Sequence, residues 1–514
     1  MSNASNKYAL SALSAQKKLP DAVATCSYIS AQQKSVDCAG NTMAVSLGVD
    51  FLLAVDSNGI VVTCGQNKYG QLGLGRRPAL HLQVTQRAMP GSIDLNSVAN
   101  QGTAIMVSAG LVHAACVTRN GSVYTWGRGS RGQLGVAHVG SQPTPQRAYS
   151  AFMGQSPAIM IACGHDHTLL LTAAGHMWGC GHNSYFQVGV QSMTNPDEID
   201  NSDISVFTMM PHARFDNGDG RTEIGFIAAG SQHSVAVGKH NGVLWTWGRD
   251  RHGTQLGHGN GQLDYCVQVP TALPRTTFGE DVVSAAAMST STMAVTASGV
   301  LWATGVSMYF ALGLGALFQC HRFSRVGGHE HFGAGGVRSV ACSISHTLIV
   351  AQDGSLWVCG NRESNCLGHY PMPYSFHVPV RIDPTCFHHE AIVVASTHLS
   401  RCVAVSASGG IYTWGSEPSG MYTGLCSAVA TAHDLLPNIA YVPQRVAHID
   451  SVGLWNYPLT EEEFLAFLMC THLRLGARSL YSALPIEMLQ SIRTSLAVPT
   501  ATHMGRGLRN LLGI

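Results

Sequence analysis

The sequence predicts an all-β protein, a seven-bladed β-propeller of four-stranded blades with a small C-terminal α-helical appendix. One stretch recurs seven times in the chain of 514 residues, and a fixed period of this kind is the mark of a repeat architecture. Each copy places a turn glycine between two apolar runs, which is the pattern of a β-hairpin. From Gly65 to Gly415 the copies occupy 350 residues in six intervals, about 58 residues each. That length suits a four-stranded sheet repeated radially.

The recurring stretch is clearest between residues 108 and 135. It reads Ser-Ala-Gly-Leu-Val-His-Ala-Ala-Cys-Val-Thr-Arg-Asn-Gly-Ser-Val-Tyr-Thr-Trp-Gly, followed by Arg-Gly-Ser-Arg-Gly-Gln-Leu-Gly. Three glycines keep their register in every copy: a turn glycine, a second glycine six residues later, and a third glycine eight or nine residues beyond that. The turn glycines are Gly59, Gly121, Gly175, Gly242, Gly299, Gly354 and Gly409.

The residues on either side of the turn glycine explain why each copy forms a hairpin. The run before it is short and apolar, as in Leu169–Leu171, and the run after it ends in aromatic residues, as in Leu244–Trp247. Dipeptides such as Asn120-Gly121 and Asp353-Gly354 tolerate the positive φ of a tight hairpin turn. A single hairpin cannot bury both of its faces, so the copies must pack against one another.

Together these motifs resemble the repeats of the regulator of chromosome condensation family, which are seven-bladed β-propellers. The resemblance covers residues 40–450. The histidine of the Gly-x-x-His motif is kept at His113, His167, His233 and His346, and the other copies have Phe51, Ser291 and Arg401. The tryptophan of the Trp-Gly motif is kept at Trp126, Trp247 and Trp414, and the other copies have Cys64, Cys180, Thr304 and Cys359.

In chain order, residues 1–39 are polar and irregular, and we expect part of this N-terminal segment to add a strand that closes the ring. The propeller follows over residues 40–450. The interval from Gly181 to Gly248 is the longest, at 67 residues, and its polar excess at Gln191–Glu223 predicts a projecting loop. Binding residues gather on loops that a rigid scaffold positions. The candidate partner-binding residues in this loop are Asp216, Asn217, Asp219 and Arg221.

The composition changes after residue 450, and residues 451–514 are predicted to be helical. Thr460–Glu463 is a capping box, and a helix over residues 460–474 follows from the apolar spacing. A second helix should begin at Pro485, a residue suited to a first turn. This region resembles the opening of an F-box, a module that binds an adaptor of ubiquitin-ligase complexes, through Leu484, Pro485, Glu487, Leu489 and Ile492. The alternative is an amphipathic helix packed on the propeller.

Composition and charge narrow the classes of function. The formal net charge is +1, and only six of the 30 basic residues are lysines, so no lysine cluster marks a nucleic-acid-binding tail. The 15 cysteines lie mostly at repeat positions, which favours buried thiols in a reducing compartment over a disulfide scaffold. No apolar run reaches the length of a membrane span, and no secretory leader is recognisable. We therefore expect an intracellular protein, cytoplasmic or nuclear, that acts without a membrane.

No motif predicts catalysis, a cofactor or a metal. Histidines near cysteines or in pairs are interpreted as repeat or loop positions, and these are His165, His167, His329, His331, His388 and His389. The stretch Asp216–Gly220 lacks the full ligand pattern of a calcium-binding loop. The Gly-Gln-Leu-Gly stretches recur in the blades and lead into no helix, so they are interpreted as bends and not as phosphate-binding loops.

These observations lead to three hypotheses on function. The first is a monomeric, non-enzymatic protein-interaction scaffold with a protein partner and no nucleic acid. The second, implied by the family resemblance, is guanine-nucleotide exchange on a small GTPase such as Ran, an activity that needs no catalytic triad. The third is a substrate receptor of a ubiquitin-ligase complex that docks an adaptor through the F-box-like segment. The sequence does not choose among them.

Overall fold

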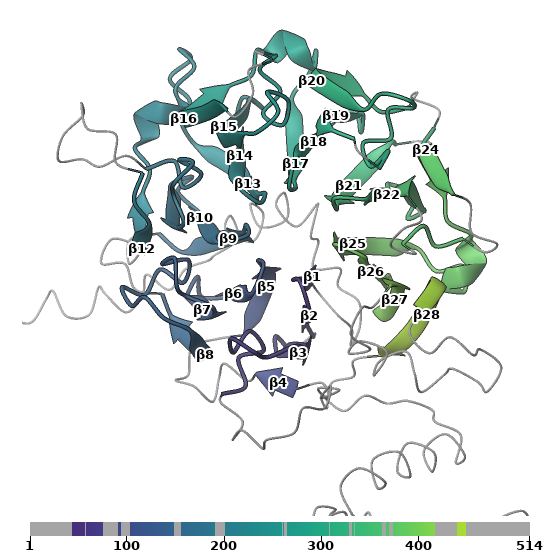
Figure 1. The fold of residues 1–514 in the computed structure, drawn as a ribbon, viewed down its shortest axis with the longest axis horizontal. Coiled ribbons are helices and arrows are strands. Elements are labelled where there is room, and N and C mark those ends of the chain that lie inside the picture. The colour runs from purple at the N-terminus through teal and green to yellow at the C-terminus, as the bar shows by residue number, and fades with distance from the viewer. Residues whose placement is uncertain are drawn as a thin grey trace, which may run out of the picture. The chain divides into compact units, whose positions relative to one another are not determined.

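The computed structural model describes residues 44–56, 58–75, 91–93, 103–148, 156–190, 201–259, 261, 265–307, 309–327, 331–333, 335–361, 366–369, 374–416 and 439–448. They form seven four-stranded antiparallel sheets that surround a central axis as blades (Figure 1). The predicted seven-bladed propeller is confirmed. The predicted N-terminal segment and the C-terminal helices lie outside the described residues. Within the described ranges, no helix has the length and hydropathy needed to cross a membrane.

Each blade is a meander of four consecutive strands that begins beside the axis and ends at the periphery. The first three blades comprise β1 (Ala44–Leu47), β2 (Phe51–Val55), β3 (Val61–Gly65) and β4 (Gly91–Ile93); β5 (Ala104–Ala109), β6 (His113–Thr118), β7 (Val123–Gly127) and β8 (Gln142–Arg147); and β9 (Ala158–Cys163), β10 (His167–Thr172), β11 (Met177–Gly181) and β12 (Ile204–Met209).

The last four blades follow the same order. They comprise β13 (Ile224–Ala229), β14 (His233–Gly238), β15 (Leu244–Asp250) and β16 (Tyr265–Ala272); β17 (Val282–Ala287), β18 (Ser291–Thr296), β19 (Leu301–Val306) and β20 (Gln319–Arg325); β21 (Val337–Cys342), β22 (His346–Ala351), β23 (Leu356–Asn361) and β24 (Ser375–Arg381); and β25 (Ile392–His398), β26 (Arg401–Ser406), β27 (Gly410–Ser416) and β28 (Ile439–His448). Short 3-10 helices connect some of the blades, namely η2 (His212–Phe215), η3 (Arg275–Thr277) and η5 (Pro384–Phe387).

The turn glycines connect the second and third strands of each blade, and their φ angles run from 57° to 84°. They also contact the next blade. The Gly121 carbonyl accepts a hydrogen bond from the Ala158 amide at 3.2 Å, and Gly299 accepts one from Val337 at 2.8 Å. A Cβ atom on Gly121 would lie 2.3 Å from the Cβ of Pro157. Glycine therefore satisfies both the turn and the close approach of the neighbouring blade.

The hydrophobic core is divided among the interfaces between blades. Seven buried clusters are present in the described residues, and each one joins two neighbouring blades. The ring closes in the same way, because Val45 and Leu47 of the first blade pack with Val394, Val403 and Val405 of the last. Mutual burial of the sheets, which the hairpin pattern predicts, is thus the basis of the fold.

The Gly-x-x-His motif links neighbouring blades through a buried hydrogen bond. His113 Nε2 lies 3.0 Å from Thr168 Oγ1 in the next blade, and that hydroxyl donates to the Gln133 carbonyl at 2.7 Å. Because the hydroxyl proton is used on the carbonyl, the imidazole is the donor in the first bond. The glycine of the motif leaves room for the ring, since a Cβ on Gly110 would lie 2.2 Å from His113 Cε1. The same link recurs at 2.9 Å in the pairs His167–Ser234 and His233–Thr292.

The Trp-Gly motif supplies a second link, directed to the preceding blade. The Trp126 indole donates to the Gln71 carbonyl at 2.9 Å, and the equivalent bonds are Trp247 to Gln187 and Trp414 to Cys366. In three of the copies where tryptophan is replaced, the new side chain reaches the preceding blade in the same way. These bonds are Cys180 Sγ to the Gln133 carbonyl, Thr304 Oγ1 to Thr254 and Cys359 Sγ to Ala311.

The interface that closes the ring uses an ion pair instead of a histidine. Leu52 occupies the position that has a hydroxyl in the links above, so a histidine at residue 401 would find no partner there. Arg401 instead pairs with Asp50 at 2.8 Å and donates to the Val49 carbonyl at 3.1 Å. The last blade takes its four described strands from Ile392–His448. The predicted closing strand from residues 1–39 falls outside the described residues and stays a prediction.

We expect the Trp126→Phe variant to lose about 1–3 kcal/mol of unfolding free energy, because the buried Gln71 carbonyl loses its indole donor. Trp178→Phe is the matched control, since Trp178 is also buried but its indole nitrogen has no hydrogen-bond partner among the described residues. Chemical denaturation of both variants measures the difference. Equal losses in the two variants would contradict the role of this bond.

The buried histidines should make the protein sensitive to acid. Burial lowers the pKa of His113 and of His233 to about 4, whereas an unfolded histidine titrates near 6.5. Between these values the unfolded state binds protons that the native state does not, so stability is complete above pH 6.5 and falls as the pH drops toward 4. The loss should reach about 3 kcal/mol for each of these histidines.

Denaturation measured across this pH range tests the prediction. The His113→Gln variant should show a shallower dependence of unfolding free energy on pH than the unchanged protein, because one proton-binding group is absent from its unfolded state. An unchanged pH slope in the variant would contradict the assignment of acid sensitivity to the interface histidines.

Candidate functional site

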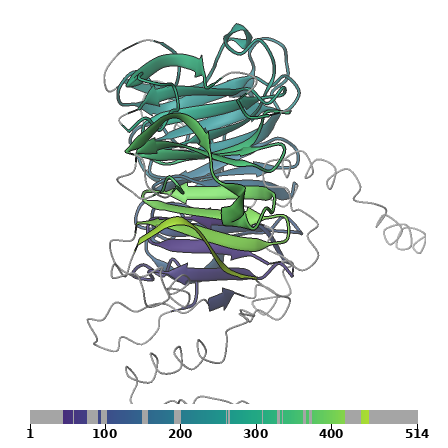
Figure 2. The ribbon, with the colours of Figure 1, turned by 90° about the vertical axis from the view of Figure 1, so that its right-hand side faces the viewer.

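The topology divides the loops between two rims of the propeller, and Figure 2 shows the blades from the side with loops at both ends of the strands. In every blade, the loops between the first and second strands and between the third and fourth strands lie on one rim, which we call the first rim. The turns between the second and third strands, together with the connections between blades, lie on the opposite side, the second rim.

The four partner-binding residues predicted in the propeller lie together on the second rim, before β13. Asp216, Asn217, Asp219 and Arg221 are all exposed. The Asp216 carboxylate accepts from the amides of Gly218 and Gly220, and Asn241 donates to Asp219 at 3.0 Å from the neighbouring turn. The stretch is therefore a turn held by its own hydrogen bonds.

The projecting loop predicted for Gln191–Glu223 is only partly correct. Residues 191–200 lie outside the described residues. Ile204–Met209 forms β12, the outer strand of the third blade, and His212–Phe215 forms η2. A peripheral strand packs on few residues, and within β12 only Phe207 is buried. Its weak apolar pattern therefore looks like that of a loop in the sequence.

Exposed large apolar side chains distinguish the two rims. Among the described residues, six lie in first-rim loops and five lie on the outer strands β12, β16 and β24, whereas none lies in a second-rim loop. Phe318 is 64% exposed and Tyr374 is 67% exposed. The first-rim set consists of Val139, Leu317, Phe318, Ile344, Tyr374 and Leu399.

Arginine side chains cover tyrosines on the first rim in the earlier blades. The Arg249 guanidinium lies 4.3 Å from the ring centroid of Tyr185, and that of Arg128 lies 5.6 Å from the ring of Tyr69. In each pair the tyrosine belongs to one blade and the arginine to the next. Tyrosine and arginine are enriched among the residues that dominate protein interfaces.

A cavity of about 250 Å³ lies on the propeller axis and is lined by the inner strands. His165 contacts Ser231 at its first-rim end, with 2.8 Å between Nε2 and Oγ. Burial lowers the pKa of His398, which also lines the cavity, to about 3. Among the described residues that line it there is no carboxylate, lysine or arginine, so this part of the lining presents no permanently charged group.

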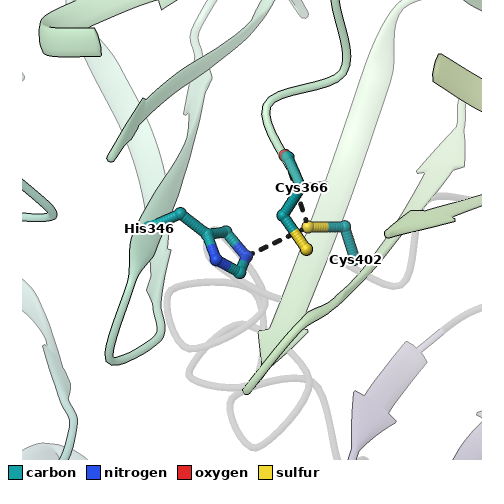
Figure 3. Close-up of side chains that lie close together, drawn as sticks. All are labelled: His346, Cys366 and Cys402. Atoms are coloured by element: carbon teal, nitrogen blue, oxygen red, sulfur yellow. Dashed lines mark hydrogen bonds between the residues drawn. The ribbon is translucent and has the colours of Figure 1, made fainter. Parts of the chain in front are cut away.

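A cluster of one histidine and two cysteines lies between the sixth and seventh blades. His346 begins β22, Cys402 belongs to β26, and Cys366 lies in the bend after β23. Figure 3 shows the imidazole pointing toward the two thiols. His346 Nε2 is 3.1 Å from Cys402 Sγ, and the three possible ligand atoms all lie within 4.8 Å of one another. All three residues are buried.

The Cys402 thiol differs electrostatically from the other buried thiols. Burial raises the pKa of Cys163, Cys342 and Cys359 to about 12. Burial also raises the pKa of Cys402, but the hydrogen bond with Cys366 and the charge of His346 outweigh it, so the pKa of this thiol is lowered to about 6.

The sequence interpretation missed this cluster. It interpreted His167, which lies near Cys163, as a repeat position, and in the structure His167 does form the repeat link to Ser234. His331 bonds the Pro379 carbonyl at 2.8 Å, as a loop residue would. The sequence did contain a sign of this cluster, because two positions of the repeat carry cysteine in place of the residue found in other copies. Cys366 stands where the Gly-Gln-Leu-Gly bend has glutamine, and Cys402 stands where the linked blades have threonine or serine.

Comparisons with known proteins agree with this fold. The family model described as RCC1-like domain matches residues 7–326. The Ultraviolet-B receptor UVR8 of Arabidopsis thaliana is 31% identical over 272 residues, 53% of this chain and 54% of the receptor. The X-linked retinitis pigmentosa GTPase regulator homolog of Caenorhabditis elegans is 26% identical over 383 residues, 74% of this chain and 24% of that protein.

Among solved structures, the crystal structure of human WBSCR16 is similar to this chain with a TM-score of 0.60 and 22% identity, over 76% of this chain and 93% of that chain. This likeness supports the fold. The chain spans about half the length of the plant relative and about a quarter of the nematode relative.

Proposed function

Because the chain belongs to the RCC1-like domain family, we propose that it is a protein-interaction propeller that binds a protein partner on its first rim. The observation that carries the proposal is the gathering of exposed apolar side chains on the loops of that rim. Exposed apolar side chains that gather in one region of a surface indicate an interaction site more strongly than the same side chains scattered singly. The described loops of the second rim have no exposed large apolar side chain, so the first rim is the favoured binding surface.

The first rim offers suitable anchors for a partner. Phe318 and Tyr374 project from the loops of the fifth and sixth blades, and the arginine-covered Tyr69 and Tyr185 lie in the earlier blades. Aromatic and arginine side chains that become buried at the centre of an interface dominate binding energy. The closed ring holds these loops in place, so less ordering entropy is lost on binding.

A second candidate surface is the turn at Asp216–Arg221 on the other rim. Its carboxylates and the Arg221 guanidinium are exposed, and its backbone is held by its own hydrogen bonds. A surface of this kind would contribute polar contacts, which adjust specificity more than affinity.

Guanine-nucleotide exchange on a small GTPase is the second candidate function. The name of the nematode relative, a GTPase regulator homolog, supports it. The third candidate, a substrate receptor of a ubiquitin-ligase complex, depends on Leu484, Pro485, Glu487, Leu489 and Ile492. These residues lie outside the described residues, and this candidate stays a prediction.

Replacing the two most exposed aromatic anchors tests the proposed surface. The double variant Phe318→Ser/Tyr374→Ser should reduce recovery of specific partners by about tenfold or more, because truncating interface anchors costs at least 1–2 kcal/mol each. Quantitative mass spectrometry after affinity purification measures the change.

Two further variants serve as comparisons in the same experiment. Tyr265→Ser removes a side chain of 43% exposure on an outer strand and should leave recovery unchanged. Arg221→Ala tests the second rim. Partners lost with Arg221→Ala but kept with the double variant would refute binding on the first rim.

Release of a fluorescent guanine nucleotide from a panel of small GTPases tests the second candidate. Accelerated release that the first-rim double variant abolishes would support exchange on this rim. No acceleration on any GTPase would remove exchange as the function and would leave the binding proposal to the partner experiment.

A further inference from the structure

The interface between the sixth and seventh blades differs from the other histidine interfaces in the chemistry of its side chains. In the earlier blades, histidine bonds a hydroxyl that in turn donates to the glutamine carbonyl of the bend, as in His113–Thr168–Gln133. In the sixth and seventh blades, Cys402 replaces the hydroxyl and Cys366 replaces the glutamine. We propose that His346, Cys366 and Cys402 form a zinc-binding site that joins these two blades.

The direction of the Cys366 side chain makes the convergence possible. In two other bends the glutamine Oε1 is held by its own loop, where Gln133 Oε1 accepts from the Arg131 amide at 2.8 Å and Gln187 Oε1 accepts from the Tyr185 amide at 3.0 Å. The Nε2 group of Gln133 donates to Asp166 of the next blade at 3.0 Å. The shorter Cys366 side chain lies in the interface beside Gly415. A Cβ atom at that glycine would be 2.8 Å from the sulfur, so glycine leaves space for it.

The spacing of the ligand atoms suits zinc. Two sulfurs at 2.3 Å and a nitrogen at 2.0–2.1 Å from a tetrahedral ion lie about 3.5–3.8 Å from one another. In the structure the three atoms lie within 4.8 Å of one another, with 3.1 Å between His346 Nε2 and Cys402 Sγ. Small side-chain rotations, without a shift of the strands, would therefore bring the ligands to bonding distance.

The hydrogen bonds around His346 also suit a metal ligand. Ser345 Oγ lies 3.2 Å from His346 Nδ1, and Thr397 Oγ1, which donates to the Arg401 carbonyl at 2.8 Å, lies 2.5 Å from Nε2. Without a metal, Nε2 therefore donates to Thr397. When zinc binds, the proton would move to Nδ1, where Ser345 can accept it, and Nε2 would offer its lone pair to the ion, the arrangement usual for ligating histidines. The Nδ1 atoms of His113, His167 and His233 have no hydrogen-bond partner among the described residues. His346 is therefore distinguished by its hydrogen bonds as well as by its neighbours.

Charge and burial favour a divalent ion. Two thiolates and a neutral imidazole around Zn²⁺ carry no net charge, which matters because an unbalanced charge is costly in a buried site. His346 and Cys366 are fully buried and Cys402 is 2% exposed. The Thr397 hydroxyl borders the cluster, 3.8 Å from the Cys402 sulfur and 2.5 Å from His346 Nε2. Three protein ligands leave the fourth position of a tetrahedral zinc ion to a water molecule.

Binding would be coupled to formation of the interface. The two cysteines must each lose a proton when zinc binds, and the ligands come from β22, a bend and β26, which are brought together only when the seventh blade packs on the sixth. We therefore expect the ion to enter during folding and to exchange slowly afterwards.

The repeat itself supplies the control variant. Cys366→Gln/Cys402→Thr restores the histidine, hydroxyl and glutamine set of the interface between the second and third blades, so this variant should fold and keep a blade link without binding zinc. The full chain and this variant, both expressed with added zinc and dialysed against a chelator, are measured by elemental analysis. We expect about one zinc per chain in the unchanged protein and less than a tenth of that in the variant.

Refolding with Co²⁺ provides a spectroscopic readout. The unchanged protein should show thiolate-to-cobalt charge-transfer absorption, and the double variant should not. Absence of zinc together with absence of this absorption would overturn the proposal. It would equally be overturned if the intact mass were lower by two hydrogens with Cys366 joined to Cys402, because the two sulfurs would then form a disulfide.

Discussion

The structure depends on one constraint, which is that no blade can bury its two faces alone. Each sheet packs one face on the preceding blade and the other on the following blade, so the seven buried clusters lie between blades and not within them. Stability is therefore collective, as in other repeat proteins. Unlike an open array, the ring has no terminal blade, because the valines of the first and last blades pack together.

The polar links between blades obey a related constraint. The carbonyl of each bend is buried at an interface and needs a donor, since an unpaired buried carbonyl is costly. Trp126, Cys180 and Thr304 meet this need from the same strand position, although their side chains differ in size and chemistry. The hydrogen bond requires a donor at this strand position, but it does not require one particular residue type. This explains how the copies can diverge while the fold persists.

Because the residue type can vary at these positions, some interfaces between blades are held by other kinds of side chain. Where the hydroxyl and the glutamine are both replaced by cysteine, the interface holds two thiols beside a histidine, the set that we propose binds zinc. At the closing interface, Leu52 removes the hydroxyl and Arg401 instead reaches Asp50 and the Val49 carbonyl. The exposed aromatic residues Phe318 and Tyr374 lie on the first rim, where we propose that a partner binds.

The sequence alone determined the blade number, the strand order and the place of each hairpin turn, because these depend on local features. A glycine such as Gly121 is needed wherever the chain turns with positive φ, and the apolar runs beside it must be buried. The outer strand β12 escaped prediction because it packs on little more than Phe207. Only the tertiary structure decided which loops share a rim and which side chains meet across an interface. His346 and Cys402 are 56 residues apart, and Cys366 lies 36 residues before Cys402. No local pattern encodes such contacts, since they exist only when one blade packs on the next.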